Sequence, residues 1–196
     1  AFLVQCNIFP YLNTMTKKNL KGLNLAELQS FVEELGEKKY RAAQLYSWLY
    51  AKAAQSFDEM TDISKSFRTV LSQVSHISNL QLITQSVSTD NTIKYLFQLN
   101  DGLAIESVLI PSTKKSSEEE KRLTLCVSTQ VGCPLDCKFC ATGMMGFTRN
   151  LTVGEIVDQV IQVQKKMKIN GRQNEATHYT CPYYFCRVRV QKKQGG

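Results

Sequence analysis

The chain has 196 residues, enough to bury the core of one ordinary domain or of two small ones. Hydrophobic residues make up 43% and charged residues 21% of it, which predicts a globular fold and excludes wholesale disorder. Its apolar runs are all shorter than the roughly 20 residues that span a bilayer, so no membrane partner is expected. The formal net charge of +7 favours a polyanionic partner, with nucleic acid first.

Residues 1–18 are predicted to be an N-terminal extension. Residues 1–14 have neither the basic start of a secretory signal nor the Arg-rich pattern of a transit peptide. The segment that begins at Met15 has the composition of an ordinary cytosolic start, so residues 1–14 are expected to lie upstream of the natural start. A true strand or tether is the alternative.

Residues 19–78 are predicted to form a small helical domain. Apolar spacing indicates helices over 25–35, 40–55 and 64–74, the first with Asn24 as its N-cap and Gly36 as its stop. The apolar side of the second helix is expected to hold Tyr40, Ala43, Leu45, Trp48, Leu49 and Tyr50. Four cations on these helices are Arg41, Lys52, Lys65 and Arg68. They form either a phosphate-binding face or an ordinary solvated face, and the solvated face is favoured.

Residues 79–121 are predicted to be a β segment followed by a loop. Strands are expected over 80–87, 92–99 and 103–110, and the turn signals between them predict an antiparallel arrangement. Residues 111–121 contain Ser, Lys and three successive Glu, so they are expected to be a polar surface loop.

A strand and a long helix are predicted in residues 122–172, on either side of a cysteine-rich loop. The strand covers 122–129, and the helix opens with a capping box made by Thr152 and Glu155. Its buried stripe is expected to hold Ile156, Val160, Val163 and Met167. This alternation predicts an α/β fold, in which active sites lie on the loops that follow strands.

The cysteine-rich loop is the strongest chemical signal in the chain. Cys133, Cys137 and Cys140 place three thiols within eight residues, and short loops of this kind hold iron–sulfur clusters. The alternative is a zinc site, whose fourth ligand would come from Cys126, Cys181, Cys186 or His178. The spacing favours the cluster. Clustered thiols also predict a reducing, cytoplasmic compartment rather than a disulfide scaffold.

Residues 173–196 are expected to be a divergent tail. The segment has no clean period, two Cys, aromatic clusters and a basic end, so it is not expected to supply the next strand of the fold. The abrupt change after Arg172 suggests a frameshift, a misjoined gene or a fragment.

The three thiols, with Phe139 before the last one, resemble the cluster motif of radical S-adenosylmethionine enzymes. The surrounding segments 122–133 and 146–151 closely resemble the RlmN/Cfr family. Members of that family methylate C2 of adenosine in ribosomal RNA and, in many bacteria, in transfer RNA. Further segments that agree with the family are 36–42, 57–63, 92–94 and 106–111. The resemblance covers residues 19–172.

The resemblance implies the cofactors. Cys133, Cys137 and Cys140 would hold a [4Fe–4S] cluster, and its open iron would take the amino and carboxylate groups of S-adenosylmethionine. Phe139 would pack near the adenosyl group. From the residues alone it is an ordinary core aromatic, and the two interpretations are compatible. An external electron donor would start the radical chemistry, which the cofactors carry while the protein orients them.

The resemblance also implies two catalytic residues. Glu106 matches the family's proton acceptor, and Cys126 matches the Cys that resolves the protein–RNA crosslink. From the residues alone, Glu106 is a solvent-facing side chain and Cys126 a small core residue. Arg149 either contacts RNA phosphate or caps the loop. The family's second catalytic Cys, which accepts a methyl group, has no match, and neither Cys181 nor Cys186 takes its role.

The sequence therefore predicts an α/β protein with the start of a partial radical-SAM (βα) barrel. A small helical accessory RNA-binding domain and a short antiparallel β segment precede the barrel. The chain is expected to be a cytoplasmic monomer that acts on ribosomal RNA, with transfer RNA as a second candidate, and to be an incomplete, inactive copy as written. The alternatives are a non-catalytic RNA-binding remnant and a zinc-stabilised module.

Overall fold

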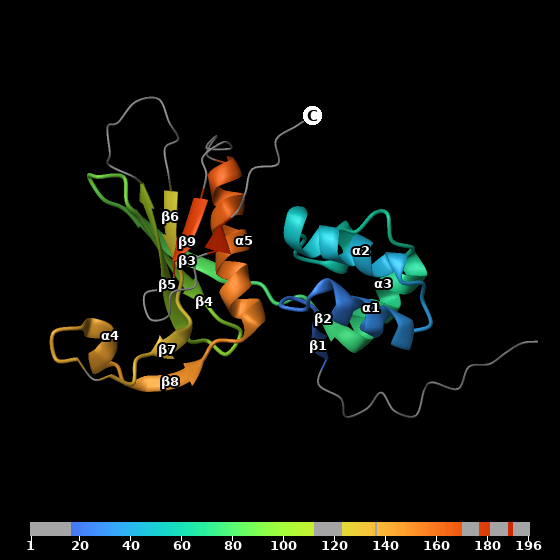
Figure 1. Ribbon diagram of the computed structural model, residues 1–196, viewed down its shortest axis with the longest axis horizontal. Coiled ribbons are helices and arrows are strands. Elements are labelled where there is room, and N and C mark those ends of the chain that lie inside the picture. The colour runs from blue at the N-terminus through green and yellow to red at the C-terminus, as the bar shows by residue number, and fades with distance from the viewer. Residues whose placement is uncertain (1–16, 112–122, 136, 170–176, 181–187, 190–196) are drawn as a thin grey trace, which may run out of the picture. The chain divides into compact units, whose positions relative to one another are not determined.

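The computed structural model describes residues 17–111, 123–135, 137–169, 177–180 and 188–189 (Figure 1). The chain divides into two compact units, one containing residues 1–20 and 24–77 and the other residues 21–23 and 78–196. The expected extension over 1–14, nearly all of the polar loop over 111–121 and most of the tail over 173–196 lie outside the described residues. The first unit is helical and the second is mixed α/β.

The helical unit follows the predicted order of helices, with short turns and a strand pair added. Its elements are β1 (Lys18–Asn19), α1 (Leu25–Glu34), α2 (Tyr40–Tyr46), the π-helical turn η1 (Ser47–Ala51), the 3-10 turn η2 (Phe57–Glu59), α3 (Lys65–Val74) and β2 (Ser75–His76). Strand β1 pairs with β2 in parallel. Asn24 is the N-cap of α1, as predicted, and its side chain accepts the Glu27 N–H at 3.0 Å.

The second helix turns a different side to the core from the one expected. Ala42, Leu45 and Leu49 are fully buried, whereas Tyr40 is 54% exposed and Ala43 is also exposed. The expectation was wrong at Tyr40 and Ala43 because this segment has apolar residues on every side. Its periodicity therefore does not select a face, and the packing of α2 against α1 does.

The α/β unit is built on a six-stranded mixed sheet in the order β10-β9-β6-β5-β4-β3. An antiparallel meander is formed by β3 (Gln81–Val87), β4 (Ile93–Gln98), β5 (Ala104–Pro111) and β6 (Leu123–Cys126). The first three strands confirm the sequence prediction. The strand expected over 122–129 is shorter, because β6 ends at Cys126 and the chain then starts a separate ribbon.

That ribbon surrounds the cysteine loop. Strand β7 (Gln130–Gly132) pairs in antiparallel fashion with β8 (Phe147–Asn150), and α4 (Ala141–Met144) lies between them in the chain. The loop is therefore the tip of a β-ribbon, and α5 (Val153–Ile169) begins directly after the ribbon.

A parallel strand follows α5. Strand β9 (Thr177–Thr180) pairs in parallel with β6, and β10 (Val188–Arg189) pairs antiparallel with β9. The expectation that no further strand follows residue 172 was therefore wrong. The outer edge of β6 offers N–H and C=O groups to any extended segment, so this pairing needs no hydrophobic period in the partner. Together β6, α5 and β9 form a βαβ unit.

Helix α5 covers one face of the sheet (Figure 1). Val163 and Met167 are buried in the same cluster as Leu109 and Leu125, and half-buried Ile156 and Val160 pack against that cluster. The predicted apolar stripe is confirmed. The predicted capping box is also present, because the Glu155 carboxylate accepts the Thr152 N–H at 2.7 Å.

A buried ion pair joins α5 to two other segments of the same unit. The Lys21 Nζ lies 2.6 Å from the Asp158 Oδ1, and both side chains are 1% exposed. The second carboxylate oxygen of Asp158 accepts the Leu80 N–H at 2.6 Å. Burial lowers the pKa of Lys21 and outweighs the opposite effect of the Asp158 charge. Asp158 therefore holds residues 21–23 and the start of β3 against α5.

Of the described helices, none is both long enough and apolar enough to cross a membrane.

Candidate functional site

The β7–β8 ribbon closes the base of the cysteine loop. The Cys133 N–H donates to the Gly146 carbonyl oxygen at 2.9 Å. At Gly132, φ is +74°, and an added Cβ would lie 1.8 Å from that same oxygen. Only glycine permits this close approach together with a left-handed backbone. The ribbon therefore fixes both ends of the loop that carries the three thiols.

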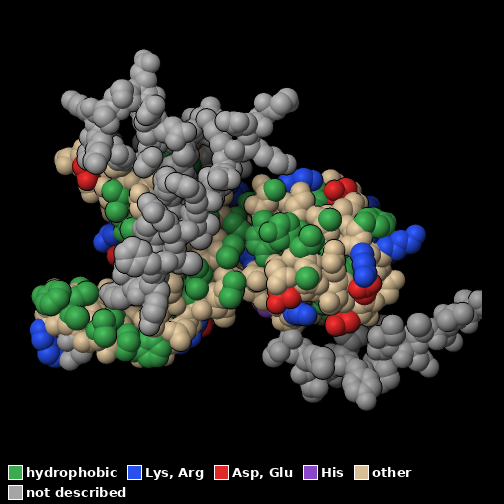
Figure 2. All heavy atoms as spheres, viewed as in Figure 1, with side chains coloured by type: hydrophobic (Ala, Val, Ile, Leu, Met, Phe, Trp, Pro, Cys, Tyr) green, Lys and Arg blue, Asp and Glu red, His purple; other side chains and the backbone are tan. Residues whose placement is uncertain are grey.

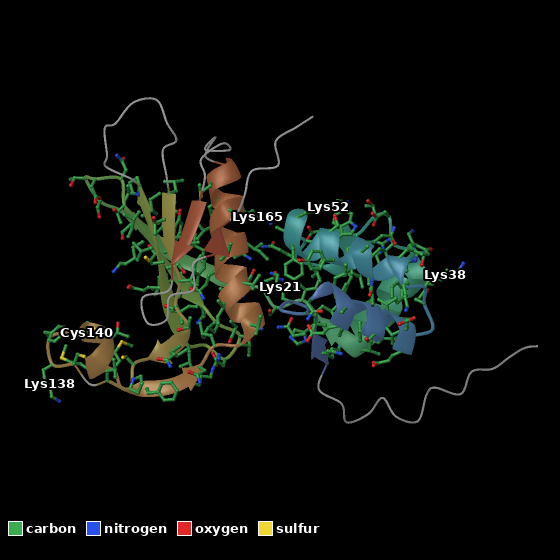
Figure 3. The ribbon with its side chains drawn as sticks, in the orientation of Figure 1. Lys21, Lys38, Lys52, Lys138, Cys140 and Lys165 are labelled. Carbon is green, nitrogen blue, oxygen red and sulfur yellow. The ribbon has the colours of Figure 1, made fainter. Side chains whose placement is uncertain are left out.

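Helix α4 positions the other two cysteines of the loop. Cys140 is the N-cap residue of α4, and its N–H donates to the Cys137 carbonyl oxygen at 3.0 Å. An added Cβ on Gly143 would lie 2.9 Å from the Cys137 nitrogen, so the missing side chain lets α4 approach the Cys137 backbone. Figure 3 shows Cys140 beside α4. Cys133 is buried, while Cys137 and Cys140 are half-buried.

The donor set of the loop is suited to an iron–sulfur cluster. The described residues of the loop supply three free thiols, which is the ligand type such clusters take. Within the described parts of the chain, however, no three Cys, His, Asp or Glu side chains are grouped closely enough to hold a metal ion. The loop thus keeps the thiols on one closed backbone segment without presenting a finished metal site.

The zinc alternative needs a fourth ligand from outside the loop. Cys181 and Cys186 lie outside the described residues. Cys126 is the last residue of β6, and His178 lies on β9 at the position that pairs with Thr124. Of the two candidates that the structure describes, neither belongs to the loop itself.

Apolar side chains surround the thiols on the outside of the loop. Figure 2 shows hydrophobic side chains gathered over α4 and β8. The exposed ones here are Leu135, Phe139, Met144, Met145 and Phe147. Phe139 is 93% exposed, so its interpretation as a core aromatic was wrong. A patch of this kind is typical of a surface that binds an apolar group.

The sheet brings the two expected catalytic side chains onto one face. In the register of β5 and β6, Val108 lies opposite Cys126, so Glu106 is the diagonal neighbour of Cys126. Side chains in this relation are about 7–8 Å apart. The alternate residues Ser107 and Leu125 are buried on the side that α5 covers. Glu106 and Cys126 therefore face away from α5.

The exposure of these two residues tests the interpretations made from the residues alone, and Glu106 is solvent-facing as that interpretation expected. Cys126 is half-buried, so its interpretation as an ordinary core residue was wrong. Glu106 is half-exposed, and its carboxylate lies 3.0 Å from the Lys94 Nζ on the neighbouring strand β4. An exposed pair of this type contributes at most about 1 kcal/mol to stability. The pair therefore orients the Glu106 side chain more than it stabilises the sheet.

Gln159 is a site residue that the sequence analysis missed. Its side chain is fully buried, and its Oε1 accepts the Ser107 hydroxyl and the Ser128 N–H, both at 2.8 Å. Its Nε2 donates to the Ser128 carbonyl at 2.8 Å, and the Ser128 hydroxyl donates to the Glu106 carbonyl at 2.7 Å. Gln159 thus fixes the backbone beneath the face that holds Glu106. The available signal was a polar residue beside the apolar stripe of α5.

Arg149 joins three segments around the base of the loop. Its guanidinium donates to Asp101 in the β4–β5 turn at 2.6 Å and to Glu155 at the start of α5 at 2.7 Å. The hydrogen bond to Glu155 raises the pKa of Arg149, and the same bond lowers the pKa of Glu155. A hydrogen bond from Arg149 also lowers the pKa of Asp101. Because two carboxylates occupy Arg149, the structure supports the cap rather than the phosphate contact.

Known proteins resemble both units of the chain. A family model described as "Ribosomal RNA large subunit methyltransferase N-terminal domain" matches residues 18–77. A "Dual-specificity RNA methyltransferase RlmN" from Geobacter sulfurreducens is 47% identical over 156 residues, which is 80% of this chain and 41% of that protein. The protein of the same name from Marinomonas sp. is 47% identical over 146 residues, 74% of this chain and 38% of that protein.

A solved structure agrees with these relatives. The crystal structure of a radical SAM methyltransferase from Sphaerobacter thermophilus matches with a TM-score of 0.70 and 39% identity, covering 82% of this chain and 45% of that one. The chain spans about two fifths of the length of the curated relatives it matches.

Proposed function

Because the chain is RlmN-like over most of its length, we propose that it contributes the cluster loop and two catalytic side chains of a radical S-adenosylmethionine RNA methyltransferase. Its target is C2 of adenosine in ribosomal RNA, with transfer RNA as a second substrate. The observation that carries the proposal is the shared sheet face of Glu106 and Cys126, on the strands that lead to a closed loop of three thiols. The protein acts as a monomer in the reducing cytoplasm.

The loop residues would hold the cofactors. Cys133, Cys137 and Cys140 would bind a [4Fe–4S] cluster through their thiolates. When bound, the cluster and S-adenosylmethionine supply a carbon radical, using an electron from an external donor. Phe139, which is 93% exposed beside the thiols, would contact the adenosyl group and exclude water from it.

The sheet face would act on the RNA base. Glu106 would accept the proton that leaves C2 of adenine, and Lys94 holds its carboxylate at 3.0 Å across the strands. Cys126 would resolve the bond between protein and RNA as a thiol nucleophile. It would attack the sulfur of the second catalytic Cys and form a disulfide, while the released carbon would keep the electron pair and take a proton to become the methyl group. A base would approach both residues from the face of the sheet opposite α5.

Anaerobic reconstitution with iron and sulfide tests the cluster. We expect a brown protein with about four irons per chain, and loss of iron when Cys133, Cys137 or Cys140 is replaced with Ala. Cys126→Ala is the matched control, because it removes a thiol outside the loop and should retain the iron. A colourless protein that still binds RNA would favour the interpretation as a non-catalytic RNA-binding remnant. Tight binding of zinc would favour the interpretation as a zinc-stabilised module.

We expect the 196-residue chain by itself not to methylate RNA. Of the described cysteines, Cys126 alone lies outside the loop, whereas the proposed chemistry uses two such thiols. Mass spectrometry of ribosomal and transfer RNA after anaerobic incubation with reductant and S-adenosylmethionine tests this expectation. Detection of 2-methyladenosine above a Cys126→Ala control would contradict it.

A further inference from the structure

The helical unit contains a pocket of about 630 Å³ whose lining residues all belong to that unit. The lining comes from the residue before β1, from η2, from α3 and from β2. Elements η2, α3 and β2 are close together in the sequence, and the parallel pairing of β1 with β2 brings the distant Lys17 beside them. The pocket is therefore a product of the fold of this unit.

The lining of the pocket is cationic. Lys17, Lys65 and Arg68 line it together with His76, and Asp58 is the one carboxylate among the lining residues. Three fixed positive charges against one negative charge make the pocket attractive to an anion.

Backbone oxygens, rather than carboxylates, hold two of the cations. The Lys17 Nζ donates to the Ser72 carbonyl at 2.6 Å, and the Arg68 Nη1 donates to the Asp58 carbonyl at 2.7 Å. A carbonyl orients a cation but leaves its charge in place. Lys65 is exposed, and its ammonium has no ion-pair partner within the described part of the chain.

Arg68 has an unused donor. Its Nε is buried and has no hydrogen-bond acceptor among the described atoms. An unpaired buried N–H is unfavourable, and a phosphate oxygen is a strong acceptor for a guanidinium. The Arg41 Nε is also buried without a hydrogen-bond acceptor, but it lies 3.7 Å from the Glu37 carboxylate, and the Lys52 Nζ lies 3.9 Å from the Asp62 carboxylate. Unlike Lys65 and Arg68, both of these cations therefore have a carboxylate beside them.

We propose that this pocket binds a phosphate group in the backbone of structured RNA. RNA presents regularly spaced phosphates, which proteins bind through Arg and Lys with a strong dependence on salt. The proposal rests on the proposed function, since that function supplies RNA as the partner. It assigns Lys65 and Arg68 to a binding site, where their sequence pattern alone favoured a solvated face.

Fluorescence anisotropy with a labelled RNA hairpin tests the pocket in the full 196-residue chain. The pocket variant is Lys17→Gln with Lys65→Gln. The matched control is Lys38→Gln with Lys39→Gln, which removes the same charge from exposed positions of the same unit outside the pocket. The pocket variant should bind about tenfold more weakly. Its slope of log Kd against log salt should fall by about two, while the control changes far less.

Several outcomes would overturn the proposal. These are equal losses in both variants, no RNA binding by the unaltered chain, and binding of polyglutamate in preference to the hairpin, which would indicate an acidic protein as the partner. If the double variant melts early by circular dichroism, Lys65→Gln alone decides, because its side chain bonds to no described residue.

Iron loading separates the pocket from the cluster. A pocket variant that loses RNA affinity should load iron like the unaltered chain. A chain that binds RNA through the pocket but takes up no iron would refute the proposed enzymatic function and leave the pocket assignment standing.

Discussion

The buried pair of Lys21 and Asp158 makes the α/β unit sensitive to single substitutions. The two side chains are 1% exposed and their charged atoms lie 2.6 Å apart. Lys21→Met leaves the Asp158 carboxylate buried with the Leu80 N–H and the Gln162 side chain as donors. Asp158→Leu leaves a buried ammonium without its carboxylate and also removes the acceptor of the Leu80 N–H. We therefore expect Asp158→Leu to be the more destabilising change.

The magnitudes follow from these contacts. Removing one partner of a buried pair costs about 3–5 kcal/mol, and an unsatisfied buried N–H adds about 1–3 kcal/mol. Lys21→Met should therefore lower the free energy of unfolding by about 3 kcal/mol and Asp158→Leu by about 5 kcal/mol. The double variant Lys21→Met with Asp158→Leu should be more stable than Asp158→Leu alone, because neither charge is left buried and unpaired.

Urea unfolding followed by two probes tests this prediction. Far-UV circular dichroism reports the secondary structure of both units, while fluorescence reports Trp48, which is the single Trp and lies in the helical unit. A loss of 3 kcal/mol should move the circular dichroism midpoint by about 1 M or more. Lys94→Met is the matched control, because it removes a lysine from an exposed pair and should cost at most about 1 kcal/mol. A cost of Lys21→Met no larger than that of Lys94→Met would refute the reasoning.

Two further predictions concern the base of the cysteine loop. Gly132→Ala should abolish iron uptake, because the added Cβ would lie 1.8 Å from the Gly146 oxygen. Gly146→Ala is the control and should retain iron uptake, because Gly146 has a similar φ but open space around it. Equal iron uptake by the two variants would contradict this prediction. Arg149 lowers the pKa of Glu155, so its contribution to stability is present above the ordinary glutamate pKa of about 4.3 and is lost as the pH falls through the lowered pKa. The urea midpoints of Arg149→Gln and of the unaltered chain should therefore converge in acid. A difference between the two midpoints that stays constant with pH would count against the proposed role of the Arg149–Glu155 pair.

Features that depend on neighbouring residues could be predicted from the sequence. Helices α1, α3 and α5, the caps of α1 and α5, and strands β3 to β5 follow from local spacing and turn residues, and the structure confirms them within a few residues. The three thiols also stand out because they are close in the chain. The expectation of which side of the second helix is buried was wrong, because apolar residues lie all around this helix. Only its packing against α1 selects the buried face.

The register in which β5 pairs with β6 could not be predicted. Glu106 and Cys126 share a face because β5 and β6 pair in one register, and a shift by one residue would place them on opposite faces. The ribbon around the cysteine loop and the parallel strand β9 depend in the same way on partners outside their own segments.

The sequence by itself determined the local elements, the candidate cluster ligands and the resemblance to the RlmN/Cfr family, since each depends on residues close together in the chain. Tertiary structure alone decided that Asp158 and Gln159 are buried and what they bind. Lys21 and Asp158 are 137 residues apart, and Ser107 and Gln159 are 52 apart, so no local pattern links them. The cationic pocket likewise depends on tertiary structure, because Lys17 meets the other lining residues only when β1 pairs with β2. A buried polar side chain is stable only with its partners in place, and those partners meet only once the chain has folded.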